Sequence, residues 1–126
     1  SGPLYQGRYK SFIIQKDNHF LTVLKYIERN PARARLVKKA ENWRWGSAWR
    51  RIHGTAQQKK LLAPSPVALP KDYQIWINTP ESPTELEEIR NSVTRNAPYG
   101  NETWVEKTTS QFNLHSTIRN PWRPKK

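Results

Sequence analysis

The sequence contains no cysteine, few acidic residues and no long apolar run. Without cysteine, disulfides, thiolate chemistry and cysteine-ligated zinc are excluded. No apolar run approaches the roughly 20 residues that a membrane-spanning helix needs, and no stretch resembles a secretion signal. Hydrophobic residues make up 35% of the chain, which allows only a modest core. The sequence therefore predicts a non-secreted protein that has no membrane partner.

Acidic residues are too few to balance the basic ones. The chain has 22 lysines and arginines against 10 aspartates and glutamates, a net charge of +12. Residues 1–60 hold 14 basic and 3 acidic residues, a net charge of +11, whereas residues 61–126 hold 8 and 7. This excess indicates a polyanionic partner, and its uneven distribution predicts that the first half of the chain contacts that partner.

In the first half, the apolar spacing predicts one strand followed by helices. Residues 7–15 alternate loosely and then run apolar, which favours a partly buried strand. An aspartate or asparagine at residues 17–18 can cap a helix. Pro31 should end that helix after Asn30, because proline lacks the backbone N–H that the helix needs. Pro31 also suits the first turn of a second helix, which we expect to run to Ala40.

In the second half, prolines and capping residues mark the expected elements. Residues 55–71 are polar and then proline-rich, which favours an exposed, extended linker. We expect residues 73–78 to form an extended aromatic strap. Residues 82–85 (SPTE) form a capping box that should open a helix, and Asn101 can cap another after a turn at residues 97–100. The two helices fit a helix-turn-helix or a plain helical hairpin.

Tyr26 and Asn30 form a candidate functional pair. They are four residues apart on one expected helix, so their side chains project from the same face. The same residues also fit a structural interpretation. Tyr26 then lies at the edge of the core with its hydroxyl hydrogen-bonded, and Asn30 caps the helix before Pro31.

The order of motifs along the chain is more specific than any single motif. From Leu4, the chain reads LYQGRYKSFIIQ, FLTVLKYIERNPARARLV and ENWRWGSAW, and later ELEEIRNSVTRNAPYGNETWV and TIRNPWRPKK. From Leu4 to Lys126, this series resembles the C-terminal part of REP-associated tyrosine transposases, members of the single-tyrosine HUH transposase superfamily. The resemblance implies single-stranded DNA, or the hairpins of repetitive extragenic palindromes, as the partner. It also implies a bacterial cytoplasmic, nucleoid-associated location.

The resemblance assigns roles to the candidate pair. In that family the tyrosine of the YIERNP-like motif, here Tyr26, attacks a DNA phosphodiester, forming a 5′-phosphotyrosine and freeing a 3′-hydroxyl. The polar residue four positions on, here Asn30, assists a divalent metal, Mg²⁺ or Mn²⁺. A phenol with an ordinary pKa of about 10 is a weak nucleophile at neutral pH, so a Lewis acid on the phosphate is needed.

One feature of the family is missing from this chain. The family's principal metal ligands are two histidines in a His-x-His motif, whereas His19, His53 and His115 stand apart in this sequence. Asn30 alone cannot hold Mg²⁺ or Mn²⁺, because each ion needs several oxygen or nitrogen ligands. We therefore expect this chain to hold no metal and to cleave no DNA by itself.

The resemblance implies an α+β fold, a partial ferredoxin-like HUH catalytic domain of one strand plus helices, followed by a helical C-terminal extension. The expected parts are the catalytic-domain portion at residues 1–54, the proline-rich linker at 55–71, the helical extension at 72–118 and a basic arm at 119–126. The matched region begins in the middle of the family's catalytic domain. We therefore expect homodimerisation, domain swapping or upstream residues to supply packing partners for the strand and the first helix.

Lysine and arginine are the candidate DNA contacts, because neutralisation of phosphates dominates the affinity of most DNA-binding proteins. The candidates are Arg8, Lys10, Arg29, Arg33, Arg35, Lys38, Arg44, Arg50, Arg51, Arg119, Arg123, Lys125 and Lys126. Residues 42–53 (NWRWGSAWRRIH) offer planar side chains that can stack on unpaired bases, although Trp43 and Trp49 also suit a core. Three functions remain open: a transposase that cuts single-stranded DNA, a non-catalytic DNA-binding regulator, and a basic RNA-associated structural protein.

Overall fold

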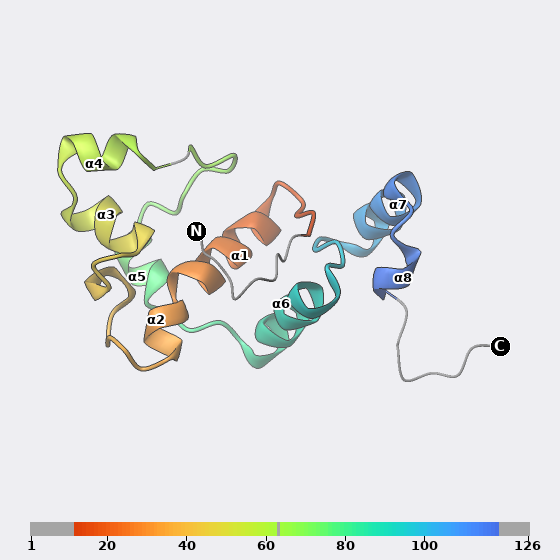
Figure 1. Cartoon of the computed structure of the whole chain (residues 1–126), viewed down its shortest axis with the longest axis horizontal. Coiled ribbons are helices and arrows are strands. Elements are labelled where there is room, and N and C mark those ends of the chain that lie inside the picture. Colours follow the sequence, from red (N-terminus) through yellow and green to blue (C-terminus); the bar gives the residue numbers. More distant parts are fainter. Residues whose placement is uncertain (1–11, 63, 119–126) are drawn as a thin grey trace. The chain divides into compact units, whose positions relative to one another are not determined.

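The structure, a computed structural model, describes residues 12–62 and 64–118 (Figure 1). These residues divide into two compact units, one of residues 16–86 and the other of residues 12–15 with 87–118. The elements are α1 (Asn18–Glu28), α2 (Asn30–Arg33), the 3-10 helix η1 (Ala40–Asn42), α3 (Ser47–His53), α4 (Ala56–Lys60), α5 (Tyr73–Ile77), α6 (Pro83–Arg95), α7 (Glu102–Phe112) and α8 (His115–Ile118).

The described residues form helices and no strand, so the expected α+β, ferredoxin-like fold is wrong. The expected strand at residues 7–15 lies partly outside the described residues. Its remaining part makes a single parallel bridge between Ile14 and Tyr99. Gln15 N donates to Tyr99 O at 2.9 Å, and Tyr99 N donates to Ile13 O at 2.9 Å. Tyr99 belongs to the turn before α7, and within residues 12–62 and 64–118 this bridge is isolated and is not extended into a sheet.

The first helix begins where its capping chemistry predicts. The Asp17 side chain accepts a hydrogen bond from His19 N at 2.9 Å, which satisfies one of the free N–H groups of the first turn. Val23 is 4% exposed and is the most buried apolar residue of α1. The helix ends at Glu28, two residues before the expected end at Asn30.

The second helix is much shorter than expected. Pro31 lies in its first turn, where the missing N–H leaves no helical hydrogen bond unmade. The helix ends at Arg33, and Arg35 then adopts a left-handed backbone with φ of 61°. Such a residue cannot continue a right-handed helix, so the helix expected to reach Ala40 was wrong beyond Arg33.

Two segments that we expected to be extended contain short helices. Within residues 55–71, α4 opens on a capping box in which Gln58 N donates to Thr55 Oγ1 at 3.1 Å and Thr55 N donates to Gln58 Oε1 at 2.9 Å. In place of the expected strap at residues 73–78, α5 forms. Its helical spacing places Tyr73, Trp76 and Ile77 on one face.

This face of α5 contributes to the core of the unit at residues 16–86. Ile77 is fully buried and clusters with the buried Ala40 of η1 and Ala48 of α3, while Tyr73 and Trp76 pack against the cluster. None of the three tryptophans of residues 42–53 is fully buried: Trp43 and Trp49 are half-buried, and Trp45 is exposed.

The two capping signals of the second half are confirmed. Ser82 and Glu85 make the reciprocal capping box that opens α6, with Glu85 N donating to Ser82 Oγ at 3.1 Å and Ser82 N to Glu85 Oε1 at 3.0 Å. The Asn101 side chain accepts from Trp104 N at 2.8 Å and caps α7. Both signals act within four residues of sequence, so local chemistry decides them.

Candidate nucleic-acid interface

Tyr26 and Asn30 lie on either side of the break between α1 and α2, and Arg33 joins them. The Arg33 guanidinium carbon is 4.1 Å from the centroid of the Tyr26 ring, in a cation–π contact. Arg33 Nη2 donates to Tyr26 O at 2.7 Å and to Asn30 Oδ1 at 3.4 Å. Tyr26 is half-buried and Asn30 is exposed. The structure therefore brings the predicted pair into one small cluster with an arginine at its centre.

Arg33 also belongs to a buried ion-pair network with Arg29 and Glu81. Arg33 Nη1 lies 3.0 Å from Glu81 Oε2, and Arg29 Nε lies 3.0 Å from Glu81 Oε1. Arg29 Nη1 further donates to Ile77 O at 3.2 Å. The side chains of Arg29, Arg33 and Glu81 are only 10%, 16% and 1% exposed. Both arginines were predicted DNA contacts, but their guanidinium groups bind the segment after α5 instead of facing solvent.

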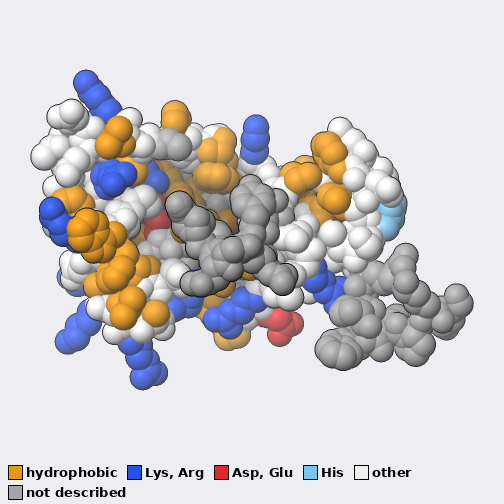
Figure 2. Space-filling model, in the orientation of Figure 1, with side chains coloured by type: hydrophobic (Ala, Val, Ile, Leu, Met, Phe, Trp, Pro, Cys, Tyr) orange, Lys and Arg blue, Asp and Glu red, His pale blue; other side chains and the backbone are white. Residues whose placement is uncertain are grey.

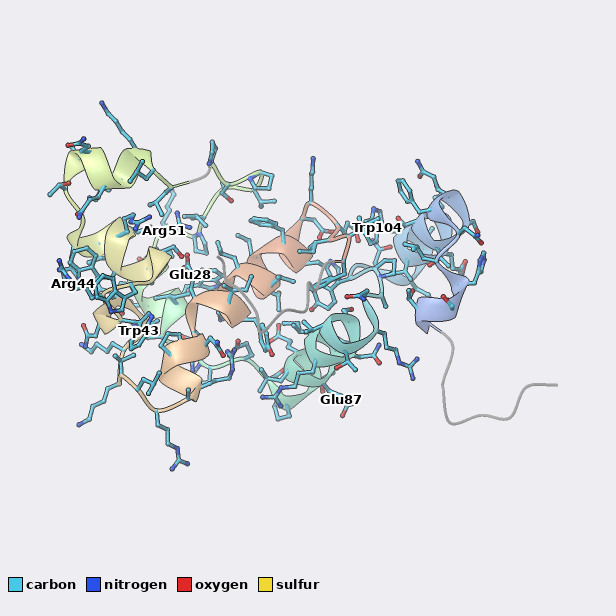
Figure 3. The ribbon with its side chains drawn as sticks, viewed as in Figure 1. Glu28, Trp43, Arg44, Arg51, Glu87 and Trp104 are labelled. Atoms are coloured by element: carbon cyan, nitrogen blue, oxygen red, sulfur yellow. The ribbon has the colours of Figure 1, made fainter. Side chains whose placement is uncertain are left out.

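A second buried carboxylate, Glu28, holds three helices together. It accepts from Ser47 Oγ of α3 at 2.5 Å and from Tyr73 Oη of α5 at 2.5 Å. Arg51 Nη2 of α3 lies 3.0 Å from Glu28 Oε2, and Figure 3 shows the two side chains pointing toward each other. Burial and the hydrogen bond to Glu28 raise the pKa of the Tyr73 hydroxyl above its ordinary value, so it remains a donor. The guanidinium of Arg51, another predicted DNA contact, is thus paired with a buried carboxylate of the protein itself.

A third buried carboxylate, Glu41, attaches η1 to α5. Gln74 Nε2 donates to Glu41 Oε2 at 2.7 Å, and Asn78 Nδ2 donates to Glu41 Oε1 at 2.8 Å. Burial alone would raise the pKa of the Glu41 carboxyl, but these hydrogen bonds bring that pKa below its ordinary value. Glu41 therefore keeps its negative charge inside the protein. Because the residue is buried, this charge is kept away from the phosphates of a ligand at the surface.

The surroundings of Asn30 do not fit a divalent cation within the described residues. The hollow beside Asn30, about 200 Å³, is lined by the apolar Ile27, Pro31 and Trp43 and also by Gly46 and Ser47. Glu28 also lines it, but the carboxylate of Glu28 already accepts hydrogen bonds from Ser47, Arg51 and Tyr73. Residues 12–62 and 64–118 contain no group of three histidine, cysteine or acidic side chains that could hold a metal. Asn30 would need ligands from elsewhere.

A second hollow, of about 280 Å³, contains a lysine that was not among the predicted site residues. Lys25 lines it together with Trp76 and Glu85, and the Lys25 ammonium lies 5.2 Å from the Trp76 ring centroid. Burial lowers the pKa of Lys25, although the charges of Glu81 and Glu85 oppose that change. Lys25 is therefore a partly buried cation, in contrast to the exposed lysines and arginines of residues 34–60.

Six exposed cations lie in or between the short helices of residues 34–60. No ion pair joins any of them to a carboxylate within the described part of the chain, and we call them the basic surface. They are Arg35, Lys38, Lys39, Arg44, Lys59 and Lys60. On the face shown in Figure 2, blue side chains are common and red ones rare over α2, α3 and α4.

The basic surface agrees only in part with the predicted contacts. Arg35, Lys38 and Arg44 were predicted from the sequence, and a fourth predicted contact, Arg50, is half-buried. Lys39, Lys59 and Lys60 were missed, although the adjacent lysine pairs were a visible signal. The remaining predicted contacts lie outside the described residues: Arg8, Lys10, Arg119, Arg123, Lys125 and Lys126.

Similarity to known proteins gives no further guide to this surface. Comparisons with family models, curated proteins and solved structures found no match to this chain. The resemblance to REP-associated tyrosine transposases thus stays a hypothesis drawn from the motifs. Among the described helices, none is both long and apolar enough to cross a membrane. The charges and contacts of the described residues therefore carry the functional argument.

Proposed function

We propose that this chain is the DNA-binding part of a tyrosine transposase and that its basic surface holds single-stranded or hairpin DNA. The separation of charge in residues 28–60 carries the proposal. The acidic residues of this segment, Glu28 and Glu41, are 5% and 2% exposed and hydrogen-bonded, whereas the six cations of the basic surface face solvent. A ligand approaching this segment meets a positive potential, which attracts the phosphates of nucleic acid.

Removing two charges from the basic surface is expected to weaken binding and flatten its salt dependence. In Lys38→Ala/Lys39→Ala, two phosphate contacts are lost, so fewer counterions are released. The slope of log K against log salt should become shallower by about 1.4 for single-stranded DNA. Fluorescence anisotropy with a labelled single-stranded oligonucleotide measures this slope. Lys107→Ala, an exposed lysine of α7, is the matched control and should leave it unchanged. A slope unchanged in the double variant would contradict the proposal.

We further propose that Tyr26 is the nucleophile where the complete set of metal ligands is supplied. Its phenolic oxygen would bond to a DNA phosphorus and lose its proton, while the 3′-oxygen leaves and gains a proton. The support is positional, because Tyr26 is half-buried at the helix break and Arg33 lies over its ring. The described residues do not complete a metal site around Asn30, so no metal-dependent step is assigned to them.

Tyr26→Phe tests the nucleophile separately from DNA binding. With the family's His-x-His ligands present and Mg²⁺ or Mn²⁺ supplied, the protein should form a denaturation-resistant adduct with hairpin DNA. Tyr26→Phe should abolish that adduct, because it removes the only atom that forms the bond, and should leave the dissociation constant for the hairpin unchanged. An adduct that persists in Tyr26→Phe would show that another residue forms the bond.

A non-catalytic DNA-binding regulator is the second candidate function. The observation that favours it is the neighbourhood of Asn30, where Ile27, Pro31 and Trp43 are apolar and the Ser47 hydroxyl and Glu28 carboxylate are hydrogen-bonded to each other. This candidate shares the salt-dependent hairpin binding but forms no adduct. A basic RNA-associated protein, the third possibility raised by the sequence, would show no preference for hairpin DNA over RNA in competition.

A further inference from the structure

The turn between η1 and α3 presents an exposed tryptophan. Gly46 N donates to Trp43 O at 3.0 Å, which closes a tight turn with Arg44 and Trp45 at its two central positions. Side chains at these positions project away from the turn. The Trp45 side chain is accordingly 77% exposed, whereas Trp43 and Trp49 on either side of it in sequence are half-buried.

Arg44 lies beside this exposed ring and keeps its charge available. Its guanidinium carbon is 4.9 Å from the centroid of the Trp49 ring and 5.8 Å from that of Trp45. Contacts of this kind orient a guanidinium without neutralising it. Arg44 is exposed at the outer edge of its unit, and no ion pair joins it to a carboxylate of the described residues (Figure 3). The turn therefore offers a planar apolar face and a free cation side by side.

We propose that this turn binds an unpaired base of single-stranded DNA. The Trp45 indole stacks on the base, and the Arg44 guanidinium contacts the neighbouring phosphate. The inference rests on the proposed DNA-binding function and adds a selectivity for unpaired bases to it. Charge complementarity favours this occupant over an apolar protein surface, because Lys38 and Lys39, both exposed, shortly precede the turn in sequence.

Stacking should give this turn a preference for unpaired bases, which the other cations of the basic surface do not have. In duplex DNA every base is already stacked on its neighbours, so its faces are closed to an aromatic side chain, while the phosphates and the groove edges of the bases stay open. In a single strand or a hairpin loop, a base can leave its neighbours and stack on an aromatic side chain instead. The cations of the basic surface thus serve both forms of DNA, and Trp45 serves only the unpaired form.

Trp45→Ala tests the proposal with two ligands, oligo(dT) of about 15 nucleotides and a duplex of similar length. We expect Trp45→Ala to weaken oligo(dT) binding about 10-fold and to leave duplex binding unchanged, because one base–aromatic stack is lost. Trp45→Phe keeps a stacking face and should retain most of the affinity. Phe112→Ala is the matched control: this aromatic of α7 is 53% exposed and should not affect either ligand.

Salt separates stacking from charge. The loss in Trp45→Ala should be about the same at 50 and at 200 mM salt, since the variant removes no charge, although overall affinity falls steeply over this range. DNA binding with that salt dependence would support the proposed role of the basic surface. If Trp45→Ala then binds oligo(dT) as tightly as the unaltered chain does, the stacking proposal alone is wrong. An equal loss for oligo(dT) and duplex would also overturn it. If neither DNA binds, or if oligo(U) binds more tightly than oligo(dT), the proposed DNA-binding function fails with it.

Discussion

Glu28→Gln is expected to lower the free energy of unfolding by about 3 kcal/mol, because it leaves the Arg51 guanidinium buried without its counter-charge. The Arg51 side chain is 18% exposed and the Glu28 side chain is fully buried, so water compensates little for the lost pair. The substitution also weakens the hydrogen bonds from Ser47 and Tyr73, which attach α3 and α5 to the end of α1. Urea denaturation followed by circular dichroism measures the change.

The control for this variant is Glu87→Gln, which makes the same chemical change on the exposed surface of α6. It should change stability by less than about 0.5 kcal/mol, as surface substitutions usually do. A loss below about 1 kcal/mol in Glu28→Gln would contradict the structural role assigned to this carboxylate. It would mean that Arg51 is free to move to solvent, where it would again be a candidate phosphate contact.

Glu81→Gln is expected to be comparably destabilising, by about 3 kcal/mol, because one carboxylate serves two arginines. Arg29 and Arg33 would remain largely buried with no opposite charge between them, and they would repel each other. Glu88→Gln, an exposed glutamate of α6, is the matched control and should be near neutral. The same denaturation experiment measures both variants.

A double-mutant cycle makes the Glu81 experiment specific. In Glu81→Gln/Arg33→Gln the second substitution removes one stranded charge, so the double variant should be less destabilised than the sum of the two single variants. Strict additivity would show that Arg33 and Glu81 do not interact. Arg33 would then be available for other contacts, and its position over the Tyr26 ring would no longer depend on Glu81.

The elements that could be predicted from the sequence are those decided within a few residues. The caps at Asp17, Asn101 and the Ser82 box depend on a side chain and a backbone N–H two or three positions away, so spacing alone identifies them. The end of α2 depends on the left-handed backbone of Arg35. Arginine rarely adopts this conformation, so its presence in the sequence does not predict that a helix ends there. The expected strand at residues 7–15 could not be decided locally, because a strand depends on partners distant in sequence; among the described residues, Ile14 makes a single bridge to Tyr99 in a turn.

The sequence predicted the positive charge of the candidate site, but it did not predict which of the charged side chains are exposed. The excess of lysine and arginine in residues 1–60 predicts a polyanionic partner, and the six cations of the basic surface lie in this half of the chain. What the sequence could not separate was exposed arginines from buried ones. Arg29 and Arg33 are paired with a glutamate about 50 residues away, and no local pattern shows such a pairing. The sequence likewise did not show which of the three tryptophans is exposed. In the structure, the turn that ends at Gly46 exposes Trp45.

The most direct test of the central claim is the affinity of the unaltered chain for a labelled single-stranded oligonucleotide between 50 and 200 mM salt. If the six cations of the basic surface each neutralise a phosphate of single-stranded DNA, log K should fall against log salt with a slope of about −4. Affinity would then drop by about 300-fold across this range. A slope near zero, or no binding at 50 mM salt, would contradict the claim that this surface holds DNA.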